Sequence, residues 1–127
     1  MVCEILKLKS VHPTIGYSHA AKAGNTLYIA GQVAKDINGN LVGVGHIENQ
    51  ARQVFTNLKN ILEEVGGNLS NIVKMTTFLT HYNFIEAFRK VRSEYFTEPC
   101  PPHTLLVVES LAMPEFMIEV EAIAVLD

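Results

Sequence analysis

The sequence predicts an α+β fold, in which a single mixed β-sheet carries two helices packed on one face. Three observations lead to this prediction. The chain has 127 residues, which fits one domain spanning residues 1–127, and its 48% hydrophobic and 18% charged residues are typical of a globular protein. Two segments have helical periodicity, and several others have the composition of strands. Their order along the chain is β-β-β-α-β-α-β-β.

The first third of the chain is predicted to be rich in strands. A strand over residues 17–23 ends at the turn pair Gly24-Asn25, and residues 26–33 form the next strand. Asn38-Gly39 predicts a type I′ hairpin turn, because both residues tolerate positive φ. Residues 41–44 would then be the short return strand.

The first helix is predicted from Ile47 to Val65, where apolar residues recur every three or four positions. Gly66-Gly67 ends it, since glycine adopts the left-handed conformation freely. Residues 72–80 are rich in Val, Thr and Phe and predict a strand. This helix and strand form a crossover, so at least part of the sheet is expected to be parallel.

The second helix is predicted to begin at Asn83, which acts as N-cap with Glu86 three residues later. Its apolar stripe consists of Phe84, Phe88, Val91 and Tyr95. Prolines within residues 98–102 exclude further helix. The remaining segments are a strand over 104–108, a turn at Pro114-Glu115 and a final strand over 117–126.

Charge and cysteine content narrow the function classes. With a net charge of −3, the chain lacks the positive electrostatic field that favours binding to nucleic acid or anionic membranes. Cys3 and Cys100 form no CxxC pair and are predicted to be free thiols. The segment Met1–Lys7 is too charged for a signal peptide, and no apolar run approaches the roughly 20 residues that span a bilayer. We therefore expect a cytoplasmic protein without membrane contact.

The final strand holds the most informative pair of residues. Glu119 and Glu121 alternate with apolar residues, so both carboxylates point to the same face of the sheet. One interpretation places them at a solvated sheet edge. The other is a carboxylate that holds a water or a proton, which requires an environment tuned by burial.

Other catalytic patterns are weak or absent. The five histidines show no metal-binding spacing such as HExxH, so no metal site is predicted. Cys100 and His103 are separated by two prolines, which defines no geometry for thiol activation. No nucleotide-binding or nucleophile-elbow motif is present. Arg89, Lys90 and Arg92 are interpreted as a solvated helix face.

Four segments together resemble the Rid family, also known as YjgF or endoribonuclease L-PSP. They are Gly16-Tyr-Ser-His-Ala20, Ala30-Gly-Gln-Val33, Ile72-Val-Lys-Met-Thr-Thr-Phe-Leu79 and Ile118-Glu-Val-Glu-Ala-Ile-Ala-Val125. Pro102-His-Thr104 occupies the family's Pro-Arg-Thr stretch. The resemblance runs from about Gly16 to Asp127, and the closing strand is its most specific part.

The resemblance implies a chorismate-mutase-like fold and a homotrimer that binds small molecules in clefts between subunits. The implied activity is hydrolysis of 2-imino acids and enamines to 2-keto acids and ammonia, without a metal or organic cofactor. Carried over by motif, the implied catalytic residue is Glu121. The implied substrate-binding residues are Tyr17, Gly31, Asn83, Phe84 and His103.

His103 stands where the family has a carboxylate-binding arginine. Arginine binds a carboxylate with two donors and a permanent charge, whereas histidine is mostly neutral at pH 7. The change could weaken binding of a carboxylate ligand by roughly 1.5–3 kcal/mol, unless acidification protonates the imidazole. Three functions therefore stay open: an imine or enamine deaminase, a non-catalytic metabolite-binding or regulatory trimer, and an RNA-acting protein. The net negative charge disfavours the third.

Overall fold

The computed structural model describes residues 3–127 and contains a six-stranded sheet with two helices. The strand order is β1-β2-β3-β6-β4-β5. The strands are β1 (Glu4–Leu6), β2 (Ala20–Ala23), β3 (Thr26–Gln32), β4 (Ile72–Leu79), β5 (His103–Val107) and β6 (Ile118–Val125). Strands β4 and β5 pair in parallel, and the other named pairs are antiparallel. The predicted α+β class with a mixed sheet is confirmed.

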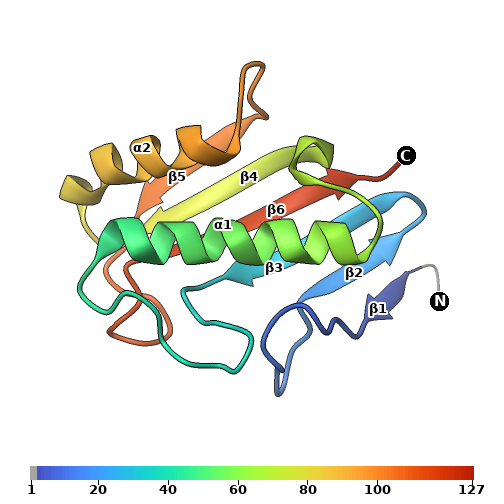
Figure 1. The fold of residues 1–127 in the computed structure, drawn as a ribbon, viewed down its shortest axis with the longest axis horizontal. Helices are drawn as coiled ribbons and strands as arrows, with labels where there is room; N and C mark the ends of the chain where they lie inside the picture. Colours follow the sequence, from blue (N-terminus) through green and yellow to red (C-terminus); the bar gives the residue numbers. More distant parts are fainter. Residues whose placement is uncertain (1–2) are drawn as a thin grey trace.

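Helices α1 (Ile47–Glu64) and α2 (Ile85–Tyr95) cover the same face of this sheet, as predicted (Figure 1). Strand β6 alternates as its sequence indicates: Ile118, Val120, Ala122 and Ala124 are buried beneath the helices. The intervening side chains belong to the opposite, uncovered face. We call this surface the open face. It matters for function because both Glu119 and Glu121 belong to it.

The glycine stop of α1 is present as predicted. Gly66 has φ +87°, and its N–H donates to the carbonyl of Glu63. The N–H of Gly67 donates to the carbonyl of Leu62, which completes a Schellman motif. The 3-10 turn η1 (Leu69–Asn71) then leads the chain into β4.

One predicted strand is absent, and one strand of the structure was not predicted. Residues 41–44 form no strand, and a single bridge joins Lys35 to Leu41. The turn is built by Asp36, whose Oδ1 accepts from the N–H groups of Asn38 and Asn40. Because only Gly39 of the Asn38-Gly39 pair has positive φ, the type I′ geometry is absent. Conversely, β1 was not predicted, since three residues show no periodicity.

The predicted N-cap of the second helix is also wrong. The 3-10 turn η2 (Tyr82–Phe84) precedes α2, and His81 caps it by accepting from the N–H of Asn83. The predicted crossover differs in detail as well. Strand β6 lies between β3 and β4, so the paired parallel strands are β4 and β5, which α2 connects.

Within residues 3–127, no helix is both long enough and apolar enough to cross a membrane. Cys3 and Cys100 are free thiols, as predicted. Met1 and Val2, at the start of the segment that we judged unlike a signal peptide, lie outside the described residues.

Candidate functional site

One hollow brings together an acid, a phenol and an ammonium group. It has a volume of about 340 Å³ and lies beside β3, β6 and the loop that precedes β6. Its polar side chains are Tyr17, Lys35 and Glu119. The rest of its wall consists of Ala30, Gly31, Val33, Ala112, Met113 and Phe116. The mixture of a few polar groups with apolar walls is typical of a small-molecule site.

Gly31 makes room for the Glu119 side chain. The pairing of β3 with β6 shifts register between Ile29 and Gln32, which is the irregularity that contains Gly31. A Cβ atom built on Gly31 would lie only 2.6 Å from Cδ and 2.8 Å from Cγ of Glu119. The glycine is therefore needed for the carboxylate to occupy its present position.

The environment of Glu119 favours its neutral form. Burial raises the pKa of the Glu119 carboxyl, and the charge of Glu121 on the same face raises it further. Burial also raises the pKa of the Tyr17 hydroxyl, with a smaller contribution from Glu119. Glu119 is thus tuned to exchange a proton closer to neutral pH, while Tyr17 remains a protonated hydrogen-bond donor.

Buried polar contacts hold the loop that carries Tyr17. The ring of His19 lies edge-on to Tyr17, with 6.0 Å between centroids. Its Nε2 donates to the carbonyl of His12 at 2.8 Å, which leaves Nδ1 to accept from Nε2 of Gln32 at 3.0 Å. Gln32 belongs to β3 and is fully buried. The loop is therefore tied to the same strand that contributes Gly31.

Two of the predicted site residues, Tyr17 and Gly31, thus meet in this hollow. Glu121 is exposed and lines a different depression of about 460 Å³, together with Ile5, Ser18 and Tyr28 among others. Sequence reasoning weighed Glu119 and Glu121 as a pair but placed the catalytic role on Glu121. The signal for Glu119 is that its side chain occupies the space beside Gly31, at the irregular register of β3.

Asn83 and Phe84 lie elsewhere, in η2 between β4 and α2. Neither residue lines the hollow. Asn83 contributes its backbone N–H to the His81 cap, and the Phe84 ring packs 5.7 Å from the His81 ring. Within one subunit, the structure therefore does not bring this pair together with Tyr17 and Gly31.

His103 is also apart from the hollow and is held by its own packing. Its Nε2 is 2.8 Å from the hydroxyl of the buried residue Thr77, and its ring stacks on Phe88 with centroids 5.5 Å apart. Burial lowers the pKa of the His103 imidazole, as do the charges of Arg92 and Lys74. The lowered pKa disfavours the protonated form of His103, which is the form that could bind a carboxylate. His103 is therefore a poor substitute for arginine.

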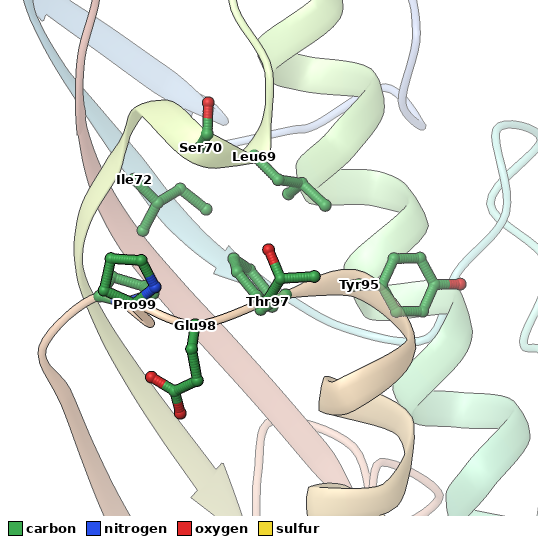
Figure 2. Close-up of a pocket in the computed structure, with 9 residues that line it drawn as sticks. Leu69, Ser70, Ile72, Tyr95, Thr97, Glu98 and Pro99 are labelled. Carbon is green, nitrogen blue, oxygen red and sulfur yellow. The ribbon is translucent and has the colours of Figure 1, made fainter.

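A second hollow, of about 350 Å³, lies between η1 and the chain that follows α2 (Figure 2). Leu69, Ile72, Tyr95 and Pro99 supply much of its lining. The carboxylate of Glu98 points away from them, and its Oε2 accepts from the N–H of Cys100. This hollow offers apolar contact without an acid or base. In the described part of the chain, no three His, Cys, Asp or Glu side chains gather as a metal site would require.

Comparison with known proteins places the chain among a defined set of relatives. Residues 7–126 match the family model described as Endoribonuclease L-PSP. A 2-iminobutanoate/2-iminopropanoate deaminase of Dermatophagoides farinae is 33% identical over 87% of this chain and 86% of its own length. A 3-aminoacrylate deaminase, RutC, of Acinetobacter baylyi is 33% identical over 88% of both chains.

Solved structures of similar proteins have the same fold as this chain. The crystal structure of yeast Mmf1 has a TM-score of 0.92 and 34% identity, and the match covers 98% of this chain and 99% of that one. A structure of TdcF from E. coli, which contains bound serine, has a TM-score of 0.88 and 26% identity, with coverage of 98% and 99%. The fold is therefore one that holds a small amino acid in at least one relative.

Proposed function

The chain belongs to the endoribonuclease L-PSP family, which includes the Rid proteins, and from this premise we propose that it hydrolyses small 2-imino acids or enamines to 2-keto acids and ammonia. The names of the two deaminase relatives support this substrate class. The observation that carries the proposal is the carboxyl of Glu119, whose pKa is raised in a hollow shared with Tyr17. The net charge of −3 argues against RNA as the substrate.

In this proposal Glu119 takes the role that the sequence assigned to Glu121. As a neutral acid it donates a proton to the imine nitrogen, and as a carboxylate it accepts a proton from the attacking water. Water adds to the C=N carbon, and the resulting carbinolamine breaks its C–N bond to release ammonia and leave the keto group. Tyr17 donates a hydrogen bond at the rim of the hollow, and the backbone at Gly31 completes the wall.

We also propose that the active form is a homotrimer with clefts between neighbouring subunits. Ile5, Tyr28, Leu106 and Val125 belong to the open face and are each 42–51% exposed. This apolar area has no cover within the described residues, and a patch of this kind indicates a protein interface. A neighbouring subunit would then supply the missing wall of the hollow, and it is from a neighbour that Asn83, Phe84 or His103 would approach the ligand.

Light scattering tests the assembly. We expect three times the chain mass of 14.1 kDa for the native protein. Tyr28→Lys places a charge on the open face and should yield monomers, whereas Tyr82→Lys, at a 74% exposed position in η2, should leave the mass unchanged. A monomeric native protein at micromolar concentration would refute the trimer.

Ammonia release tests the reaction. The substrate 2-iminobutanoate is generated in the assay, and ammonia is measured above the spontaneous rate. Glu119→Gln should lower the catalysed rate by about 10²–10⁴-fold, because an amide cannot exchange the proton. Glu121→Gln is the matched control on the same strand face and should retain most of the activity. If the two variants lose activity in the reverse order, Glu121 is the catalytic carboxylate.

A second candidate, a non-catalytic metabolite-binding trimer, is favoured by one observation. His103 replaces the family's arginine and is held by Thr77 and Phe88. This candidate is supported if the native protein binds 2-oxobutanoate but releases no ammonia above the spontaneous rate.

A further inference from the structure

The backbone of Lys35 is held firmly at the edge of the hollow. The carbonyl oxygen of Lys35 accepts from Nδ2 of Asn57 at 3.0 Å, and the carbonyl of Val33 accepts from the same nitrogen at 3.1 Å. Asn57 belongs to α1 and is buried, and its Oδ1 accepts from Gln53 at 2.8 Å. These hydrogen bonds anchor the chain just after β3, so the Lys35 side chain starts from an ordered position.

The ammonium group of Lys35 has a charge that no carboxylate in residues 3–127 neutralises through an ion pair. Its Nζ lies 5.9 Å from the centre of the Phe116 ring, a cation–π geometry that holds the group beside the hollow. The neighbouring Asp36 directs its Oδ1 into its own turn, where it accepts from Asn38 and Asn40. Among the residues lining the hollow, Lys35 is the one cation.

The ligands named for relatives all carry a carboxylate: iminobutanoate, iminopropanoate, aminoacrylate and serine. In this chain the residue expected to bind that group is His103, whose pKa is lowered by burial and whose ring stacks on Phe88. The hollow that contains Glu119 therefore needs a positive charge from another residue.

We propose that Lys35 binds the carboxylate of the ligand and so replaces, within the subunit's own hollow, the charge that the family's arginine supplies. The proposal rests on the proposed function for the chemical class of the ligand. A carboxylate at Lys35 lies in the same hollow as Glu119, whose tendency to be neutral limits repulsion of an anionic ligand. The ammonium forms a charge-assisted hydrogen bond with the ligand from its position over the Phe116 ring.

Binding of a matched pair of probes tests the proposal. Titration calorimetry on the full chain uses 2-oxobutanoate and its uncharged analogue 2-oxobutanamide. Lys35→Met keeps an unbranched, flexible side chain but removes the charge, and it should weaken 2-oxobutanoate binding by about ten- to a hundredfold. Binding of the amide should stay unchanged, and Lys35→Arg should retain binding of the acid. Lys59→Met, an exposed lysine on α1, is the control and should behave as the native protein.

Three results would overturn the role of Lys35: no binding of 2-oxobutanoate by the native chain, unchanged binding in Lys35→Met, or an equal loss for the acid and the amide. Ammonia release, measured in parallel, separates this inference from the proposed function. Lys35-dependent binding without ammonia release refutes the deaminase and supports the carboxylate site. Ammonia release with an unchanged KM in Lys35→Met supports the deaminase and refutes the carboxylate site at Lys35.

Discussion

Gly31→Ala is a small substitution that separates catalysis from stability. The added methyl group would lie 2.6 Å from Cδ and 2.8 Å from Cγ of Glu119, whereas carbon atoms in contact are usually about 3.5–4.0 Å apart. The carboxylate must therefore move by about 1 Å or more. A displacement of that size at a reacting group costs about 10²-fold in rate. We expect the rate of ammonia release to fall by this factor.

The fold should tolerate the same substitution. Gly31 is not among the glycines with positive φ, so alanine meets no backbone strain there. The nearest atoms to the new methyl group belong to a flexible side chain. Replacing glycine restricts the unfolded chain and contributes about 0.4–1 kcal/mol to stability, which offsets part of the cost of moving Glu119. The free energy of unfolding, measured by urea titration, should change by less than about 1 kcal/mol.

A double-mutant cycle shows whether Gly31 acts through Glu119. In a Glu119→Ala background the carboxylate is gone, so adding Gly31→Ala should cause no further loss of rate. The reasoning is refuted if Gly31→Ala retains full activity, or if its effect adds to that of Glu119→Ala. A variant that loses activity because it unfolds would be recognised in the urea titration.

Two further predictions concern packing and pH. Phe55→Ala should lower the free energy of unfolding by about 3–5 kcal/mol in urea titration, because Phe55 is fully buried with the rings of Phe88, Tyr95 and Phe96 within 6.0 Å; a loss below about 1 kcal/mol would contradict this. Burial, Arg92 and Lys74 lower the pKa of His103, so the unfolded chain binds its proton more readily than the folded one, and stability should fall as pH drops below about 6.5. The thermal midpoint of His103→Gln should fall less between pH 7.5 and 5.5 than that of the native chain, and equal slopes would show that His103 is not responsible.

The elements that were predicted correctly have strong local signals. The apolar period of α1, the glycine stop at Gly66 and the alternation of β6 each depend on residues close in sequence. The errors have two different causes. β1 exists because it pairs with β2 across the intervening chain. The predicted cap at Asn83 is wrong because the 3-10 turn η2 precedes α2, and the His81 side chain caps that turn by accepting from the N–H of Asn83. Apolar periodicity indicates neither the β1–β2 pairing nor the His81 cap.

In the candidate site, the sequence of β6 predicts some features, and others depend on contacts with β3 and α1. Alternation along β6 places Glu119 and Glu121 on one face, but it does not distinguish the two positions. The distinction comes from β3, where the register shifts and Gly31, which has no side chain, leaves space for the side chain of Glu119. Lys35 follows the same strand and depends on Asn57 of α1 for its position. In this fold, a glycine at an irregular point of one strand therefore identifies the catalytic candidate on its neighbour, because only there does a carboxylate have both burial and space.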